Sequence, residues 1–466
     1  MSEQNNLTLD QKYARTRKLS IKEGMAASIT GGAGESYITP FALELKASNF
    51  QISLLSGLAS LIGPIAQLGG SRLIEKFSRR SIVVTSVILH ASVWFIFASL
   101  GGWFYFYGQS YLLIPLLILA YIIYALAGSL GGPAWFSLLG DAVPENIRGA
   151  YFSNRNKINI AVNISATLLA SLLLFYAKEN QWLILAFISL FIIAGIARYF
   201  SAFFLSKHHE EKMSLPENYF FSLWQFIRKA PSNNFGRFAI YVAAINLAMN
   251  ISGPFFAIYM WRDLALNPIW YTIISISGSL FTLLFMPMWG KFADRYGNRE
   301  LLKIGSLIII PASVLWLFSA NPFYLIFVPQ LVTGVGWAAF SLAASNFIYD
   351  SVTPERRAIC VAYQNVLSGL GVFLGAGLGG LIVKYIDFKS FNILFLAFIL
   401  SAIVRSVFVS LILPSIKEVL SDKYPTKENP LLYFKELAIG ETISSHLYPL
   451  GEILGLKKGK EEQNKF

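Results

Sequence analysis

The residues that decide the fold read GKFADRYGNR at positions 290–299, between two long apolar runs. A diverged copy, SRLIEKFSRR, occupies positions 71–80. Each copy is followed by a second related segment, DAVPENIR at 141–148 and DSVTPERR at 350–357. The same charged segments in the same order predict a duplicated membrane unit, an arrangement that places a binding site between two repeats.

The composition predicts a protein that is folded within a lipid bilayer. The chain has 466 residues, of which 55% are hydrophobic and 15% aromatic, and its mean hydropathy is +0.55. Apolar runs of about 20–27 residues recur, each long enough to cross a hydrocarbon core of about 30 Å as a helix. We therefore predict an all-α polytopic membrane protein with twelve transmembrane helices in two six-helix pseudo-repeats. The runs start near Ile21, Gln51, Ser81, Tyr111, Tyr151, Trp182, Phe238, Pro268, Leu301, Pro322, Ala358 and Phe391.

Positive charge is distributed unevenly between alternate loops, and this sets the predicted orientation. The formal net charge is +12. If the N-terminus is cytoplasmic, nearly all basic residues lie in cytoplasmic segments, as the positive-inside rule requires. We predict a multi-pass protein of the cytoplasmic membrane with both termini inside, and the basic charge then reflects topology and not nucleic-acid binding. The basic residues predicted on the outer side are Lys46, Lys178, Arg262, Lys384 and Lys389.

Polar segments divide the chain into five predicted regions. Aromatic residues beside Arg228 and Lys229 predict a short amphipathic helix on the inner membrane surface, and the C-terminal tail has a similar composition. The first segment is interpreted as a solvated linker and the C-terminal segment as an anchoring tail. The alternative for both is partner binding or regulation. The regions are an N-terminal segment at 1–20, a six-helix bundle at 21–206, a linker at 207–236, a second bundle at 237–413 and a tail at 414–466.

The segment at 290–299 resembles the inner-loop signature of the major facilitator superfamily: glycine, any three residues, aspartate, arginine, any residue, glycine, any residue, arginine. The first copy departs from this pattern, because Ser71, Glu75 and Ser78 replace the two glycines and the aspartate. The resemblance covers about residues 21–413 and implies two six-helix halves around a central cavity, which transport a small molecule by alternating access. The matching residues of the second copy are Gly290, Asp294, Arg295, Gly297 and Arg299.

The charged loops are predicted to form a latch that closes the cytoplasmic side. Glycine permits a tight turn and close helix approach, arginine can clamp a carboxylate with two hydrogen bonds, and a carboxylate is stabilised near a helix N-terminus. The alternative is a set of charged turns without a gating role, which the duplicated acidic residues disfavour because Asp and Glu contribute little to topology. The predicted inner-gate residues are Glu75, Arg79, Asp141, Arg148, Gly290, Asp294, Arg295, Gly297, Arg299, Asp350, Glu355 and Arg357.

Four ionisable residues within the apolar runs are candidates for a role in the membrane. Glu35 is the one acidic residue that we place near the middle of a span, so we predict that it binds and releases a proton, the alternative being a hydrogen bond to a neighbouring helix. His90 is a second candidate for proton coupling, although a lone histidine among apolar residues is more often simply packed. Arg198 and Arg405 lie at matching depths, and we predict structural roles with side chains that reach the inner surface, or else contacts with anionic lipid or substrate.

Polar residues at helical spacing predict a cavity, with helix packing as the alternative for each stripe. Asn246 and Asn250 precede a predicted helix break at Gly253. Turned inward, these groups would form a mostly aromatic cavity with a few hydrogen-bonding groups, typical of a small-molecule site. Glycines at 371, 375 and 379 are interpreted as close helix packing. The cavity candidates are Thr39, Tyr121, Tyr124, Asn159, Asn163, Asn246, Asn250, Gln330, Trp337 and Ser341.

The sequence disfavours an enzyme and an ATP-driven pump. It has a single cysteine, Cys360, no histidine pair at metal spacing and no phosphate-binding glycine loop, so we predict no metal and no cofactor. We predict a monomeric secondary transporter of a small, neutral or amphipathic solute, working by rocker-switch alternating access with proton coupling through Glu35. The alternatives are a uniporter without ion coupling and a polytopic receptor or scaffold that transports nothing.

Overall fold

The computed structural model describes residues 8–74, 76–211, 222–386 and 392–419, and every regular element in these ranges is a helix. The first half of the chain forms six membrane-spanning units, several of them interrupted. In chain order they are α1 (Leu9–Ala33), η2 (Glu35–Tyr37), α2 (Ile38–Glu44), α3 (Asn49–Leu73), α4 (Arg79–Tyr107), α5 (Leu113–Leu130), α6 (Gly132–Ala142), α7 (Glu145–Glu179) and α8 (Leu183–Ser206).

The second half repeats this plan after a short helix in the linker. Its elements are α9 (Leu223–Lys229), η3 (Ala230–Ser232), α10 (Asn234–Asn250), α11 (Gly253–Ile258), η4 (Tyr259–Asp263), α12 (Pro268–Tyr296), α13 (Asn298–Ile309), η5 (Pro311–Leu317), α14 (Pro322–Leu325), η6 (Ile326–Gln330), α15 (Leu331–Ser351), α16 (Pro354–Tyr385), α17 (Ile393–Ile412) and η7 (Leu413–Ser415). The linker helix α9 lies where the amphipathic helix was predicted, and its Phe226 is buried against Ile359 and Tyr363. Almost all of the C-terminal tail, from residue 420, lies outside the described residues.

Eleven of the described helical segments are long and apolar enough to cross a membrane. They correspond to every predicted run except the first. Helix α1 is more polar, yet it packs along α7 and α8, and a Cβ at Gly32 would lie 2.5 Å from the Asn163 carbonyl oxygen. It is therefore the twelfth helix of the bundle. It begins at Leu9 and not near Ile21, because Thr8 and Gln11 cap it with reciprocal hydrogen bonds.

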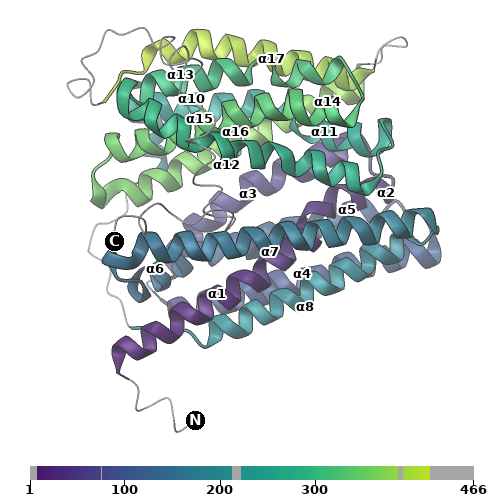
Figure 1. Ribbon diagram of the computed structural model, residues 1–466, viewed down its shortest axis with the longest axis horizontal. Helices are drawn as coiled ribbons and strands as arrows, with labels where there is room; N and C mark the ends of the chain where they lie inside the picture. Colours follow the sequence, from purple (N-terminus) through teal and green to yellow (C-terminus); the bar gives the residue numbers. More distant parts are fainter. Residues whose placement is uncertain (1–7, 75, 212–221, 387–391, 420–466) are drawn as a thin grey trace, which may run out of the picture.

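The halves lie side by side and share one end. Figure 1 shows the helices of the second half above those of the first, with α2, α11 and α14 toward the end opposite the N-terminus. We call that end the far end; it contains the turns after α2 and after η4. The opposite end, where α1 begins, is called the near end. A single hydrophobic cluster at the far end contains residues of both halves, including Phe41 and Trp261. The clusters built around Phe292 and around Leu138 each contain residues of one half.

Helix α16 makes close contacts on two faces. Cβ atoms at Gly371, Gly375 and Gly379 would lie 2.2, 2.1 and 2.2 Å from carbonyl oxygens of the α10 segment, which confirms the predicted close packing. On another face, Cβ atoms at Gly369 and Gly380 would lie 2.2 and 2.1 Å from atoms of α3 in the first half. These glycines allow α16 to approach one helix of its own half and one helix of the other.

The turn in the signature segment depends on Gly297. This residue lies between α12 and α13 with φ 89° and ψ 166°, a region of backbone conformation that is essentially restricted to glycine. At the matching place in the first copy, Ser78 has φ −63° and caps α4 by accepting a hydrogen bond from the Ser81 amide. Ser78 therefore starts the next helix through a side-chain cap, whereas Gly297 does so through its backbone conformation. A Cβ at Gly290 would meet no atom within 4 Å, so the predicted close approach there is not present in this structure.

We expect Gly297→Ala to lower the free energy of unfolding by about 1–3 kcal/mol, the cost of forcing alanine into this backbone region. The measurement is the melting temperature of the detergent-purified protein. Gly290→Ala is the matched control, since that position lies inside a helix with open space and alanine favours helix. Equal melting temperatures for the two variants would contradict a special backbone requirement at Gly297.

Candidate functional site

A cavity of about 660 Å³ lies between the two halves. Its walls come from α1, η2 and α7 of the first half and from α12 and α15 of the second. The residues that line it carry hydroxyl, amide and aromatic groups beside aliphatic ones, and none of these described lining residues is charged. The polar and aromatic lining residues are Ser28, Ser36, Tyr37, Asn159, Asn163, Thr167, Tyr271, Thr272, Ser275, Ser279, Thr282 and Trp337.

One amide in this cavity has unused hydrogen-bonding capacity. The Asn159 Oδ1 atom is shielded from solvent and accepts no hydrogen bond from the described residues. Its neighbour one helical turn along, Asn163, donates from Nδ2 to the Ser28 carbonyl oxygen at 3.2 Å. This buried oxygen lies against α1, because a Cβ at Gly24 would be 2.6 Å from it, and an acceptor without a partner is costly.

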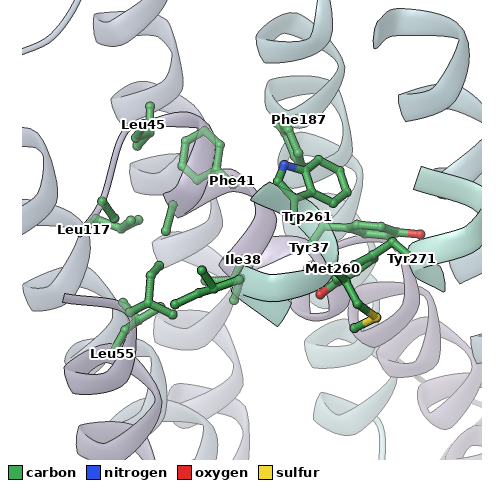
Figure 2. Close-up of a cluster of buried hydrophobic side chains, with 14 of the residues drawn as sticks. Tyr37, Ile38, Phe41, Leu45, Leu55, Leu117, Phe187, Met260, Trp261 and Tyr271 are labelled. Carbon is green, nitrogen blue, oxygen red and sulfur yellow. The ribbon is translucent and has the colours of Figure 1, made fainter. Parts of the chain in front are cut away.

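Contacts between the halves close the cavity at the far end. The Tyr37 hydroxyl donates to the Thr167 carbonyl oxygen at 2.7 Å and lies 2.9 Å from the Thr272 hydroxyl of the other half. Toward the turns, Trp261 Nε1 donates to Glu44 Oε1 at 2.8 Å and Arg262 Nη1 donates to Asn49 Oδ1 at 2.8 Å. Figure 2 shows Tyr37 beside Tyr271 and Met260, and Trp261 beneath Phe187, in one continuous buried cluster.

A second cavity, of about 310 Å³, lies within the first half and contains the Glu35 carboxylate. Tyr124 donates to Glu35 Oε1 at 2.5 Å, and the Tyr124 and His90 ring centroids lie 4.0 Å apart. Arg198 Nε donates to His90 Nδ1 at 3.2 Å. The structure thus brings both candidates for proton coupling together with a tyrosine and an arginine, from α4, α5 and α8.

A buried ion pair was not predicted. Glu23 in α1 is 5% exposed, and its Oε2 lies 2.9 Å from Nη2 of Arg155 in α7, which is 7% exposed. Ser201 donates to the other Glu23 oxygen at 3.3 Å, and Arg155 Nε donates to the Ser20 hydroxyl at 3.1 Å. The prediction placed Glu35 alone near the middle of a span, and it did not single out Glu23, which lies within helix α1. The available signal was that Glu23 and Arg155 both lie within predicted helices. Because the first run was predicted to start near Ile21, Glu23 was placed at the beginning of that run.

The two arginines at matching depths differ in their partners. Arg198 is half-buried beside the cavity that contains Glu35. Arg405 is 3% exposed, so the prediction that its side chain reaches the inner surface is wrong. Its guanidinium donates to the Ile309 carbonyl oxygen and the Ser313 hydroxyl, and at 2.9 Å to the Ser401 hydroxyl. These neutral acceptors satisfy the buried charge, which supports the predicted structural role.

Of the ten predicted cavity residues, Asn159, Asn163 and Trp337 line the cavity between the halves. Tyr124 lines the cavity within the first half, where Tyr121 stacks on it with ring centroids 5.7 Å apart. The others are absent from both linings. Three of them donate to carbonyl oxygens of their own helices, namely Asn246, Asn250 and Ser341. Gln330 donates to the Ile274 carbonyl oxygen of another helix. Thr39 also lies outside both linings.

The predicted gate residues of the first half form an ion pair within that half. Arg79 Nη1 lies 2.8 Å from Asp141 Oδ2. In the second half, Asn298 Nδ2 donates to Asp350 Oδ2 at 2.7 Å, Arg357 donates to the Val352 carbonyl oxygen at 3.4 Å, and Arg295 lies over the Tyr296 ring. Asp294 is exposed. Glu75 lies outside the described residues, as do the side chains of Arg148 and Glu355, and a latch between the halves stays a prediction.

Two carboxylates that were not predicted lie at the N-terminus of a neighbouring helix. Glu210 accepts from the Arg79 amide at 2.6 Å, at the start of α4. Glu418 accepts from the Arg299 amide at 2.7 Å, near the start of α13. Each carboxylate follows the last membrane-spanning helix of its half. It caps the third membrane-spanning helix of the same half, α4 or α13, at the end where the helix dipole stabilises negative charge. Their equivalent positions after α8 and α17 were the signal that could have identified them.

The sequence is similar to a known protein family and to individual transporters. The model of the Major Facilitator Superfamily matches residues 24–249 and 238–454. Vacuolar basic amino acid transporter 2 of Saccharomyces cerevisiae is 27% identical over 146 residues, which are 31% of this chain and 30% of the relative. Human solute carrier family 67 member A1 is 30% identical over 131 residues, 27% of this chain and 30% of the relative. The match thus spans less than a third of each relative's length.

Solved structures share the fold over nearly the whole described chain. A mutant form of the nucleoside transporter NupG superposes with a TM-score of 0.67 at 15% identity, covering 86% of this chain and 100% of that one. A bacterial homologue of the human lysosomal transporter Spinster, in an inward-facing and occupied conformation, gives a TM-score of 0.66 at 13% identity, covering 91% of this chain and 100% of that one. At these identities the likeness concerns the fold.

Proposed function

Because this chain belongs to the Major Facilitator Superfamily, we propose that it is a secondary transporter of a small, uncharged, hydrogen-bonding solute. The observation that carries the proposal is the cavity between the halves. Its volume of about 660 Å³ suits a small molecule, and both halves contribute to its lining. A site shared by two repeats can open to either side of the membrane when the repeats rock against each other.

The lining favours a neutral solute that presents several polar groups. Hydroxyl groups of Ser, Thr and Tyr both donate and accept hydrogen bonds, which matches a ligand that carries hydroxyl or amide groups. Tyr271 and Trp337 add aromatic surface for a ring or an apolar face. A charged solute would leave its charge without a counter-ion among the described lining residues, and burying an unpaired charge is costly. Sugars and nucleosides are solutes of the favoured kind.

The contacts at the far end support an inward-facing state in this structure. The positive-inside rule assigns the near end to the cytoplasm, so the closed far end is the outer one. Glu35 is exposed within its cavity and accepts a hydrogen bond from Tyr124, which suits an ionised carboxylate. In this proposal Glu35 binds a proton in the outward-facing state and releases it to the cytoplasm in the inward-facing state.

We expect uridine and xylose to raise the melting temperature of the detergent-purified protein, and lysine and citrate to leave it unchanged, since a ligand of the folded state stabilises it. Trp337→Ala and Asn159→Ala are each expected to weaken binding of the stabilising solute about tenfold, through lost aromatic contact or a lost hydrogen bond. Asn250→Ala is the matched control, because Asn250 bonds within its own helix.

Stabilisation by lysine or citrate, and not by the neutral solutes, would show that the proposed solute class is wrong. Uptake of the stabilising solute into proteoliposomes then tests coupling. We expect an inwardly directed proton gradient to drive uptake against the solute gradient in the wild type, and Glu35→Gln to abolish that response. Uptake that is indifferent to the proton gradient would identify a uniporter.

A further inference from the structure

One short turn belongs to both cavities. Helix α1 ends at Ala33 and is followed by Gly34, and the turn η2 then contains Glu35, Ser36 and Tyr37. Glu35 lines the cavity within the first half, whereas Ser36 and Tyr37 line the cavity between the halves. In a 3₁₀ turn with three residues per turn, side chains two positions apart leave the backbone in different directions. The turn therefore connects the buried side-chain cluster around Glu35 with the contact between the halves.

The turn is held firmly on the Glu35 side. A Cβ at Gly34 would lie 2.4 Å from the Trp94 ring, so the end of α1 rests directly on that indole. The Tyr124 ring packs edge-on against Trp94 at a centroid distance of 5.1 Å and donates its hydroxyl hydrogen to Glu35. The titratable and charged groups that face Glu35 are His90 from α4, Tyr121 and Tyr124 from α5, and Arg198 from α8.

The Tyr37 side of the turn holds the two halves together. Tyr37 is fully buried, and its hydroxyl donates to the Thr167 carbonyl oxygen in α7. Because that hydrogen is used, the Thr272 hydroxyl of α12 donates to the Tyr37 oxygen, 2.9 Å away. This hydrogen bond joins the first half to the second beside Tyr271, as Figure 2 shows for the two tyrosine rings. A small shift of the turn would break it, since hydrogen bonds weaken steeply with misalignment.

The charge on Glu35 determines how firmly the turn is held. An ionised carboxylate accepts a charge-assisted hydrogen bond from Tyr124 and is attracted by the guanidinium of Arg198 across the same cavity. Protonation removes the charge, and with it the attraction and about half of the strength of the hydrogen bond. The position of the turn in this structure, with the far end closed, therefore matches ionised Glu35.

We infer that the turn Glu35–Tyr37 couples proton binding to the outer gate: ionised Glu35 holds the Tyr37–Thr272 contact in place, and protonation of Glu35 releases it so that the far end opens. The inference rests on the proposed transport function, and it adds how a proton site outside the central cavity controls access to the solute. Proton and solute then act on the same turn from two sides without touching each other.

The test measures the two gates directly, without any solute. Spin labels are placed on cysteines at Tyr111 and Phe318, which are 86% and 70% exposed at the far end of each half, in a Cys360→Ser background. A second pair, at Lys207 and Lys303, reports on the near end. Double electron–electron resonance then gives both distance distributions between about pH 8 and about pH 5.

In the wild type we expect acidification to lengthen the far-end distance and to shorten the near-end distance. Glu35→Gln, which mimics the protonated acid, is expected to show the long far-end distance at every pH. Tyr37→Phe and Thr272→Val remove one hydroxyl each from the contact and keep the side-chain shape, and both are expected to abolish the pH response. Tyr324→Phe is the matched control, because the Tyr324 hydroxyl donates to the Leu315 carbonyl oxygen within the second half, and it is expected to keep the wild-type response.

Titration of His208 does not interfere with this measurement. His208 is 2% exposed near the cytoplasmic end of α8, and burial, with a smaller contribution from the charge of Arg155, lowers its pKa to about 4. It therefore stays neutral over the tested range.

Two results would overturn the inference. If the wild-type distances do not change with pH, the proton does not control the gates. If both Tyr37→Phe and Thr272→Val keep the full pH response, the turn is not the connection, whether or not Glu35 binds the proton. Failure of the proposed transport function is distinguishable, because it would appear as a lack of solute binding and uptake while the pH-dependent distances remained.

Discussion

Arg155→Met is expected to lower the free energy of unfolding by about 3–5 kcal/mol, the usual effect of leaving one member of a buried ion pair unpaired. The Glu23 carboxylate would remain buried with the Ser201 hydroxyl as its remaining described side-chain donor. Since Arg155 joins α7 to α1, its loss would also loosen the first half on its near-end side. The measurement is the melting temperature of the purified protein together with the yield of folded protein.

The double variant Glu23→Leu/Arg155→Met separates the pair from the individual side chains. Replacing a whole buried ion pair by apolar residues of similar volume is often neutral or stabilising. We therefore expect the double variant to melt closer to the wild type than either single variant does. If instead the two single effects add, the Glu23–Arg155 contact contributes no coupling energy, and another role of each residue must explain the loss.

Gly375→Ala is expected to lower the free energy of unfolding by about 1–3 kcal/mol or more and to impair transport. Its Cβ would lie 2.1 Å from the Leu247 carbonyl oxygen, a backbone atom that can be accommodated only if α10 and α16 move apart. Because α16 also packs on α3, that displacement would spread to the contact between the halves. Melting temperature and uptake into proteoliposomes measure the two effects.

Gly377→Ala gives the comparison within the same helix. A Cβ at Gly377 would meet no atom within 4 Å, so alanine adds helix propensity without a clash. We expect this variant to be as stable as the wild type or more stable by up to about 1 kcal/mol. A loss of stability equal to that of Gly375→Ala would mean that helix packing is not the reason for the glycine.

The sequence predicted the helical membrane fold well because long apolar runs and charged loops are local signals. The twelve helices, the break at Gly253 and the close packing at Gly375 all follow from residues near one another in the chain. The sites were predicted less completely. Asn159 and Trp337 line the central cavity as expected, whereas Asn246 and Gln330 had the same spacing and bond to nearby carbonyl oxygens instead.

The missed residues share one physical cause. Glu23 and Arg155 lie far apart in the sequence, as do Glu210 and the amide that it caps, and each contact exists only after helices have packed. Spacing along one helix shows which side chains share a face, but the neighbour of that face depends on the whole bundle. Ser78 illustrates the opposite case, since its role as a cap in place of a glycine is local and could have been recognised from the sequence.

The two capping carboxylates have a consequence for dividing the protein into fragments. The helices of the first half end at Ser206, but Glu210 beyond them caps α4. In the same way, Glu418 beyond α17 caps α13. A first-half fragment that stopped with its last helix would leave the amide groups at the start of α4 without their acceptor. A split version of this protein should therefore retain both carboxylates, so that each fragment can fold before the fragments associate.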